Sequence, residues 1–310
     1  MGEHDDRTPT LLWMHLHVRI TPFWLWFVNS WLRFHLSMSR LSQRYKKVFL
    51  TGGRSGLGRA FLDMLLDSGL EVWATSRNPA DLPNLPKLHP LALDLRDPEG
   101  VQNTVASLIQ EVPDIDLVIN NAGYGVFSPV EALPKEHIQG QLQVLLESPM
   151  LISQAFYKQM ITRGAQGCFV HVSSLAAQFP IPWMSLYNAS KAGLATFSRS
   201  LALEAKGHGI AVIDFQPGDF QTDFNEAMLR FDSGDTRATD LWATLEDNLS
   251  QGPRPAYAAK VLKKALLKQR SGLICAGSPF QAKIAPFLAR FASNQLLDRC
   301  LRWYFNLPNK

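Results

Sequence analysis

Three side chains are spaced so that they could act together on one oxygen atom: Ser174, Tyr187 and Lys191. Tyr187 and Lys191 are four residues apart in a helical pattern, so the phenol and the ammonium lie on one helix face. A nearby positive charge favours the phenolate and lowers its pKa from the ordinary value of about 10. Such a phenol can exchange a proton with a carbonyl or alcohol oxygen. Ser174, at the end of the preceding apolar run, could hydrogen-bond the same oxygen.

The same spacing also fits an ordinary helix start with an incidental tyrosine and a surface lysine, so the surrounding elements must decide. Mostly apolar segments predict strands over residues 47–50, 71–76, 88–95, 116–119, 167–172, 210–215 and 273–276. Helices are predicted over residues 59–66, 101–112, 135–163 (bent near Pro149) and 185–206. This alternation predicts an α/β fold, a Rossmann-like doubly wound parallel sheet of about seven strands with helices on both faces. Ligands bind such sheets at the carboxyl ends of the strands.

The first predicted strand runs into a glycine-rich loop, Thr51-Gly52-Gly53-Arg54-Ser55-Gly56-Leu57-Gly58, and a helix follows. Glycines let the backbone approach a pyrophosphate, and the positive end of the helix dipole favours its charge. The order strand, glycine loop, helix therefore predicts a dinucleotide-binding site.

The second predicted strand ends at Ser76 without the acidic residue that commonly holds the ribose hydroxyls of NAD(H). Arg77 follows instead, and Arg54 of the glycine loop could join it, because a guanidinium matches the geometry of a phosphate. Arg77 could also be a solvated turn residue. We favour NADP(H) as the cofactor, with NAD(H) as the weaker alternative.

Two further strand ends carry candidate ligand contacts. Asp94, after the third strand, could hydrogen-bond an adenine, or it could cap the helix that begins after Asp97. The fourth strand runs into Asn120-Asn121-Ala122-Gly123, whose small residues let the backbone pass close to a ligand.

Together these residues resemble the short-chain dehydrogenase/reductase family from about residue 46 to residue 276. Residues 51–58 match its TGxxxGxG loop and residues 120–123 its NNAG motif. Ser174, Tyr187 and Lys191 match its Ser and Tyr-xxx-Lys residues, with a thirteen-residue step from the serine to the tyrosine. Pro217-Gly218 with Thr222 matches its PGxxxT element. Five motifs in order and register make the resemblance specific.

The resemblance implies a role for each matched residue. Tyr187 would exchange the proton with the substrate, Lys191 would lower its pKa and hold the nicotinamide ribose, and Ser174 would orient the substrate oxygen. The implied cofactor-binding residues, which include Tyr187 and Lys191, are otherwise Gly52, Arg54, Ser55, Gly56, Leu57, Gly58, Ser76, Arg77, Asp94, Leu95, Asn121, Ala122, Gly123, Pro217, Gly218 and Thr222. Family members often pair through their long helices, which implies a homodimer or homotetramer.

One position departs from the family pattern. The family has an Asn in the helix before the fifth strand, and here Leu145 follows Val144. Leucine cannot hold the water that relays protons from the lysine. A nearby polar residue, Gln141 or Gln143, could take the place of the Asn, or turnover could be slower. Alternatively, the alignment of this helix with the family pattern is off by one helical turn.

The composition excludes several classes of function. The chain has 310 residues, 46% hydrophobic and 19% charged, which is typical of a globular protein. The net charge of +4, without an arginine-rich run or zinc finger, does not indicate nucleic acid binding. Three isolated cysteines suit a reducing compartment, and the eight histidines show no metal-ligand spacing. We expect a cytoplasmic protein without a metal.

Residues 1–45 have a different composition and hold four of the eight tryptophans. Their longest uncharged run, residues 20–32, is shorter than the roughly 20 apolar residues of a membrane span. The acidic start does not resemble a signal peptide. The segment could lie in a membrane interface, pack on the body of the protein, or precede a true start at Met38.

The main domain is predicted over residues 46–278, with a substrate lid at about 219–255 and a basic amphipathic tail over 279–310. Large apolar side chains favour a lipophilic substrate: in the lid Phe220, Phe224, Met228, Leu229, Phe231, Leu241 and Trp242, and in the tail Ile284, Phe287, Leu288, Phe291, Leu297, Leu301, Tyr304 and Phe305. The same residues could simply pack in the core. The basic tail also suits peripheral contact with an anionic membrane.

The sequence thus predicts an NADP(H)-dependent oxidoreductase that interconverts a lipophilic ketone or aldehyde and its alcohol, with Tyr187 handling the proton. The alternative is a weakly active or inactive NADP(H)-binding sensor or scaffold, for which Leu145 is the main support.

Overall fold

The computed structural model describes residues 40–231 and 234–307. Most of the predicted N-terminal extension, residues 1–39, lies outside these ranges. Residues 40–44 are helical, and Leu41 and Tyr45 are buried in the core. The predicted division into extension, main domain and tail stays a prediction. No helix within the described ranges has both the length and the apolar character needed to cross a membrane.

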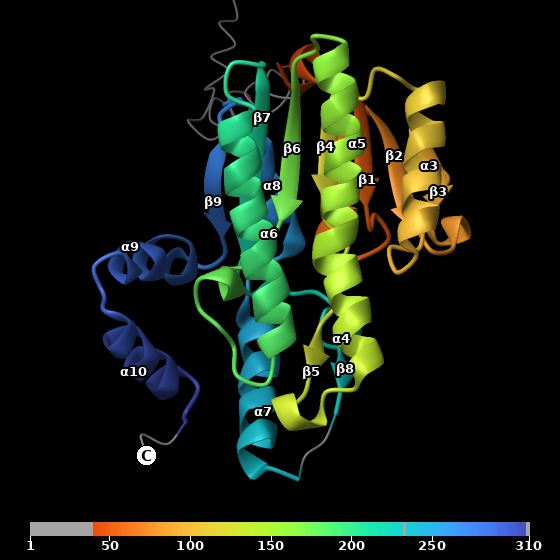
Figure 1. Ribbon diagram of the computed structural model, residues 1–310. Helices are drawn as coiled ribbons and strands as arrows, with labels where there is room; N and C mark the ends of the chain where they lie inside the picture. Colours follow the sequence, from red (N-terminus) through yellow and green to blue (C-terminus); the bar gives the residue numbers. More distant parts are fainter. Residues whose placement is uncertain (1–39, 232–233, 308–310) are drawn as a thin grey trace, which may run out of the picture. The chain divides into compact units, whose positions relative to one another are not determined.

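Seven parallel strands form the central sheet in the order β3-β2-β1-β4-β6-β7-β9 (Figure 1). They are β1 (Lys47–Thr51), β2 (Glu71–Ser76), β3 (Leu88–Ala92), β4 (Leu117–Asn120), β6 (Gly167–Val172), β7 (Ile210–Pro217) and β9 (Gly272–Ala276). The strand order reverses between β1 and β4, so the crevice at their carboxyl ends is the expected ligand site. The predicted doubly wound parallel sheet is confirmed, although β3 ends three residues earlier than expected.

Helices cover both faces of the sheet and create two apolar cores. The helices α3 (Pro98–Glu111), α5 (Ser148–Thr162) and α6 (Ser185–Glu204) pack on one face, which is the nearer one in Figure 1. The helices α2 (Gly56–Asp67) and α8 (Pro255–Leu266) pack on the other face. Double cover explains why β4, β6 and β7 are buried along their whole length and are mostly apolar.

The single helix predicted over residues 135–163 is divided in the structure. It consists of α4 (Lys135–Leu142), a π-helical turn η3 (Gln143–Glu147) and α5. Proline lacks a backbone N–H and its ring crowds the carbonyl four residues earlier, so Pro149 disfavours a regular helix at Leu145. A π turn accommodates this conflict. It also places Leu145, the residue that departs from the family pattern, in an irregular segment.

The remaining elements surround the carboxyl end of the sheet. The strands β5 (Val126–Phe127) and β8 (Leu229–Arg230) form a small parallel pair. The predicted lid contains β8 and α7 (Thr236–Gln251). The predicted tail contains the π-helical turn η5 (Phe280–Ile284), α9 (Ala285–Ala289) and α10 (Asn294–Tyr304). Short 3-10 turns are η1 (Pro79–Asp81), η2 (Val130–Ala132) and η4 (Leu175–Ala177).

Candidate active site

The three predicted catalytic side chains meet at the carboxyl end of β6. Ser174 follows this strand, and Tyr187 and Lys191 lie in the first two turns of α6. The Ser174 hydroxyl hydrogen-bonds that of Tyr187. Lys191 Nζ donates to the carbonyl oxygen of Val172 at 2.7 Å and lies 5.7 Å from the centroid of the Tyr187 ring. All three residues are at least nine-tenths buried, so a reaction there would take place largely out of water.

Burial, rather than the charge of Lys191, has the largest effect on the pKa of Tyr187. Loss of hydration raises the pKa of Tyr187 to about 12, against the lowering effect of the bond with Ser174. Burial also lowers the pKa of Lys191 to about 8. The expected net lowering of the Tyr187 pKa is therefore not found, because desolvation outweighs the lowering effects, and Lys191 Nζ donates to the Val172 carbonyl oxygen.

The backbone of the glycine loop leaves no room for a side chain at Gly52 or Gly58. Gly52 has a φ of +72°, in the left-handed region that favours glycine. A Cβ atom on Gly58 would lie 1.8 Å from the carbonyl oxygen of Gly52. The helix α2 begins at Gly56 with no capping side chain and no acid in its first turn. Its N-terminal N–H groups are therefore suited to a pyrophosphate, and the loop fits a dinucleotide.

The loop after β4 is fastened to the glycine loop by hydrogen bonds. Asn121 Nδ2 donates to the carbonyl oxygens of Thr51 and Gly52 at 3.0 and 3.1 Å. The backbone N–H groups of Asn121 and Ala122 both donate to Thr51 Oγ1, at 2.9 and 3.1 Å. Thr222, from the segment after β7, lies within 3.5 Å of the point where a Gly56 Cβ would be. The segments after β4 and β7 thus both reach the glycine loop that follows β1.

The two arginines predicted to meet a 2′-phosphate differ in their surroundings. Arg54 Nη1 forms an ion pair with Asp81 Oδ2 at 3.0 Å, so a neighbouring carboxylate already offsets its charge. Arg77 makes no ion pair with any residue of the described ranges. As expected, no acid stands at the end of β2. Arg77 is therefore the better placed of the two to receive a phosphate.

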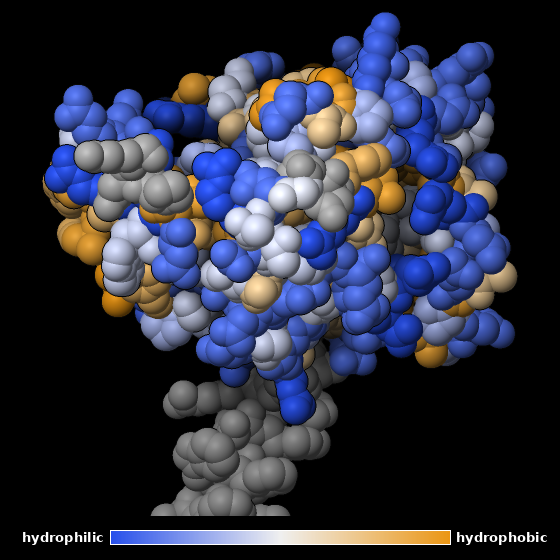
Figure 2. All heavy atoms as spheres, turned by 90° about the horizontal axis from the view of Figure 1, so that it is seen from below, coloured by the Kyte–Doolittle hydropathy of each residue, from blue (hydrophilic) through white to orange (hydrophobic). Residues whose placement is uncertain are grey.

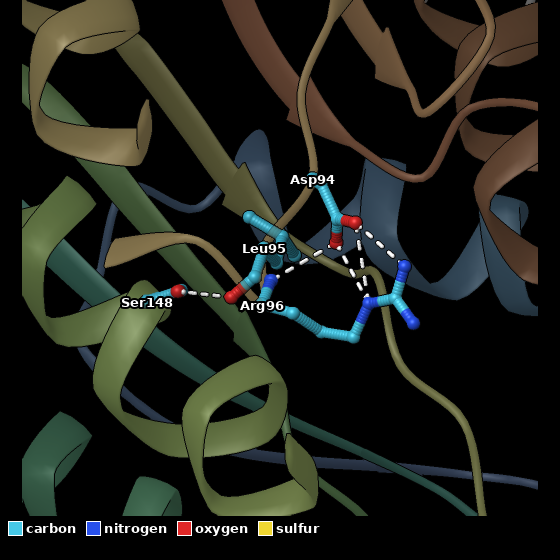
Figure 3. A network of polar contacts seen from close by, with 4 residues as sticks. All are labelled: Asp94, Leu95, Arg96 and Ser148. Carbon is cyan, nitrogen blue, oxygen red and sulfur yellow. Dashed lines mark hydrogen bonds and ion pairs between the residues drawn. The ribbon is translucent and has the colours of Figure 1, made fainter. Parts of the chain in front are cut away.

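Asp94, predicted to contact an adenine, is bound by an arginine that the sequence analysis did not single out. Arg96 donates to Asp94 from its backbone N–H at 3.0 Å and from its guanidinium at 2.7 to 3.2 Å (Figure 3). This contact with Arg96 lowers the pKa of Asp94. The carbonyl oxygen of Leu95 accepts from the Ser148 hydroxyl at 2.7 Å. The helix cap is Asp97, which accepts from the Gly100 N–H at 3.0 Å.

Leu145 lies near Lys191, the predicted catalytic lysine. A Cβ atom on Gly123 would be 2.8 Å from Leu145 Cδ2 and 3.7 Å from Lys191 Nζ. The amide of Gln143 donates to Ser148 and that of Gln141 to the carbonyl oxygen of Tyr124. Neither glutamine hydrogen-bonds the lysine, and the Gln141 Oε1 is buried without a partner among the described residues.

All of the predicted site residues line a single cavity of about 1650 Å³. Of the lid residues, Phe220, Phe224, Met228 and Leu229 line it, whereas Phe231, Leu241 and Trp242 do not. Leu241 is fully buried in the core, and Trp242 packs edge-on against Phe127. Of the tail residues, all but Ile284 and Phe287 line it.

Several lining residues were missed in the sequence analysis. Phe179, Ile181 and Met184 come from the loop between Ser174 and Tyr187, whose position between two predicted catalytic residues was an available signal. Asp219 and Gln281 also line the cavity and contact each other although they are far apart in sequence. No local pattern could have paired them.

Comparisons with known proteins agree with this geometry. The family model for short chain dehydrogenase matches residues 46–232. The chain is 31% identical over 179 residues to 3-ketodihydrosphingosine reductase of Bacteroides thetaiotaomicron, covering 58% of this chain but less than two thirds (65%) of that relative. It is 30% identical over 175 residues to carbonyl reductase [NADPH] 2 of Sus scrofa, covering 55% of this chain and 70% of that relative.

A solved structure shows the same arrangement of elements. The structure of a short-chain dehydrogenase from Streptomyces avermitilis superposes with a TM-score of 0.72 at 25% identity, covering 81% of this chain and 94% of that one. The family model matches more than half of the chain, and the strand order, the glycine loop and the Ser-Tyr-Lys group fit together. The chain therefore belongs to the short-chain dehydrogenase/reductase family.

Proposed function

We propose that this protein is an NADP(H)-dependent oxidoreductase that interconverts a lipophilic ketone or aldehyde and its alcohol. The observation that carries the proposal is the placement of Ser174, Tyr187 and Lys191 in the same cavity as the glycine loop. The relative named carbonyl reductase [NADPH] 2 supports both the reaction and the cofactor.

Each residue of the group has a defined task in this reaction. NADPH, when bound, supplies the hydride. Tyr187 gives its phenol proton to the carbonyl oxygen, or takes a proton from the alcohol in the reverse direction. Ser174, already hydrogen-bonded to Tyr187, donates to the same oxygen and fixes its position. The Lys191 ammonium, anchored on Val172, stabilises negative charge that develops on the phenol oxygen.

The cofactor preference rests on the surroundings of Arg77. This guanidinium is free of ion pairs within the described part of the chain, and it follows a strand that ends without an acid. A 2′-phosphate would give this guanidinium an ion-pair partner, whereas the end of β2 lacks the acid that commonly holds the ribose hydroxyls of NAD(H).

The proposal of a lipophilic substrate is supported by the apolar side chains that line the cavity. Phe224 packs against Tyr187 with ring centroids 5.7 Å apart. Beyond it the wall is built from apolar side chains of the lid and of α10, such as Met228, Leu297 and Leu301. A wall of this kind favours an apolar chain or ring next to the carbonyl.

The first test combines cofactor binding with turnover in one variant. Tyr187→Phe removes the proton donor but no cofactor contact of the glycine loop. We expect ketone reduction to fall at least 10³-fold, while NADPH affinity, measured by titration followed through protein fluorescence, stays close to that of the wild type.

The wild-type protein should bind NADPH more tightly than NADH, and Arg77→Ala should reduce that difference.

Two results would contradict the proposal. Activity retained in Tyr187→Phe would exclude the phenol as proton donor, and tighter binding of NADH than of NADPH would overturn the cofactor assignment. The second candidate function, a cofactor-binding sensor or scaffold, is favoured by Leu145 beside Lys191. It predicts NADPH binding with no reduction of any tested ketone.

Contact with an anionic membrane surface belongs to the same proposal. In the tail, Phe287, Phe291 and Trp303 are 58%, 77% and 79% exposed, and basic side chains such as Lys283 and Arg299 lie beside them in the sequence. Figure 2 shows apolar side chains among hydrophilic ones on the side where Figure 1 places α9 and α10. Exposed aromatic residues with flanking cations suit the headgroup region of a bilayer.

We also propose that the protein associates with a second copy of itself. A groove between α5 and α6 is lined by Leu151, Tyr157, Phe197 and Leu201. Its apolar lining on the long helices suits the pairing of two copies, as the family resemblance implies.

A further inference from the structure

A carboxylate, Asp219, is set into the wall of the cavity directly after the Pro217-Gly218 step. Its Oδ2 accepts a hydrogen bond from Gln281 Nε2, and its backbone N–H donates to Gln281 Oε1 at 3.3 Å. Within residues 40–231 and 234–307, no cation pairs with it and no hydrogen bond reaches its Oδ1. One carboxylate oxygen is therefore left for a ligand.

Two glycines leave room for the contact between Asp219 and Gln281. A Cβ atom on Gly218 would lie 2.7 Å from Gln281 Oε1, and one on Gly277 would lie 3.0 Å from it. These glycines follow β7 and β9, whose ends pair as Pro217 with Ala276. The absence of side chains at both positions lets the Gln281 amide reach Asp219 and fix the direction of its carboxylate.

Asp219 lines the same cavity as Ser174, Tyr187 and Tyr304 of α10. Its negative charge contributes to the raised pKa of both tyrosines. Burial raises the pKa of Asp219 itself, with the bond from Gln281 acting against that rise. An ionised carboxylate in such surroundings costs free energy unless a cation or several donors meet it. A neutral amide on one oxygen offsets only part of this cost.

We propose that Asp219 binds the ammonium group of a long-chain amino ketone or amino alcohol whose oxygen is held at Tyr187. This inference rests on the proposed function and names its substrate class. The ammonium donates a charge-assisted hydrogen bond to Asp219 Oδ1. The hydrocarbon chain lies along the apolar wall that Leu288, Leu297 and Leu301 contribute. Carboxylate and apolar wall together distinguish this class from a plain lipophilic ketone.

The test compares two ketones that differ only in the amine: 2-aminododecan-3-one and dodecan-3-one. With NADPH, wild-type kcat/KM should favour the amino ketone roughly tenfold to 100-fold, the range expected for a hydrogen bond between charged partners. Asp219→Asn keeps the shape and a polar partner for Gln281 but removes the charge, so the preference should disappear while dodecan-3-one is still reduced.

A matched control is Asp223→Asn, because Asp223 also borders the cavity but is exposed. It loses the same charge and should keep the wild-type preference. Equal use of the two ketones by the wild type, or a preference that survives in Asp219→Asn, would overturn the assignment of Asp219. Reduction of dodecan-3-one in either case would leave the proposed function standing.

A binding measurement separates the two proposals when no ketone is reduced. Dodecylamine should bind to the wild-type protein more tightly than dodecanol in a calorimetric titration, and Asp219→Asn should lose that difference. This outcome would support the ammonium site even for a protein without turnover. Equal binding of the amine and the alcohol would exclude it.

Discussion

The two halves of the cavity are built in different ways. The half at the glycine loop between β1 and α2 is fixed by close backbone contacts, such as the bonds that the Gly52 and Gly53 N–H groups donate to the Thr75 carbonyl oxygen at 3.2 and 3.3 Å. The half formed by η5, α9 and α10 is fixed mainly by side chains, many of them exposed, and by single polar contacts such as Asn248 to Tyr304 at 3.1 Å. Backbone contacts tolerate almost no change, whereas exposed side chains can be exchanged at little cost in stability. The first half should therefore hold a constant ligand and the second a variable one.

The most severe disturbance of the backbone-built half should come from Gly58→Ala. The added Cβ would lie 1.8 Å from the Gly52 carbonyl oxygen and 2.5 Å from Asn121 Nδ2. We expect a loss of about 3 kcal/mol in the free energy of unfolding and more than tenfold weaker NADPH binding, measured by urea denaturation and fluorescence titration.

The control for this variant is Gly140→Ala in α4, where the nearest atom to the added Cβ is the Tyr124 hydroxyl at 3.3 Å. Helix propensity favours alanine there by up to about 1 kcal/mol, so its unfolding free energy should not fall in the same way. Similar losses in both variants would show that tight contact is not what distinguishes the glycine loop.

A second prediction concerns His171, which lies fully buried in β6 and pairs with Asn120 of β4. Its Nε2 and Nδ1 lie 2.9 and 2.7 Å from the hydroxyls of Ser153 and Ser198. Burial lowers the pKa of His171 to about 3. Below pH 6.5 the unfolded chain therefore binds a proton that the folded chain does not, and stability falls as the pH falls.

The expected size of this effect follows from the linkage between protonation and folding. Each pH unit below about 6.5 lowers the unfolding free energy by about 1.4 kcal/mol, and the total loss at pH 5 is about 2 kcal/mol. His171→Gln lacks this titration, so the gap in unfolding free energy between wild type and variant should narrow by that amount from pH 7 to pH 5. Parallel urea titrations at the two pH values measure it, and a constant gap would contradict the buried neutral imidazole.

The smallest effect on stability should come from the side-chain-built half. Phe291 and Trp303 are 77% and 79% exposed, so replacing both with serine should change the unfolding free energy by less than about 0.5 kcal/mol for each. The same change should weaken sedimentation with anionic vesicles at low salt, because the aromatic contacts with the bilayer are lost.

Leu203→Ser provides the control for this pair. Leu203 is 71% exposed on α6, outside the tail, and its replacement should leave vesicle binding unchanged. If the wild-type protein stays entirely in the supernatant, the proposed membrane contact fails. If the double variant unfolds much more easily than the wild type, the tail is part of the core and the contrast between the two halves is wrong.

The sequence by itself determined the sheet and the backbone-built half of the site. Strand patterns, the glycine loop at residues 51–58 and the spacing of Tyr187 and Lys191 are local features, and each follows from the conformation of a few neighbouring residues. Local rules could also indicate an irregularity near Pro149, but its form as a π turn at residues 143–147 depends on how the segment packs.

Only the tertiary structure decided how charges and side chains from distant segments meet. It paired Arg54 with Asp81 and left Arg77 free of ion pairs within the described residues, and it placed Asp219 against Gln281. It also reversed the expected direction of the Tyr187 pKa, because desolvation depends on everything packed around the phenol. Electrostatics and burial sum over the whole fold, so no local pattern of residues can specify them.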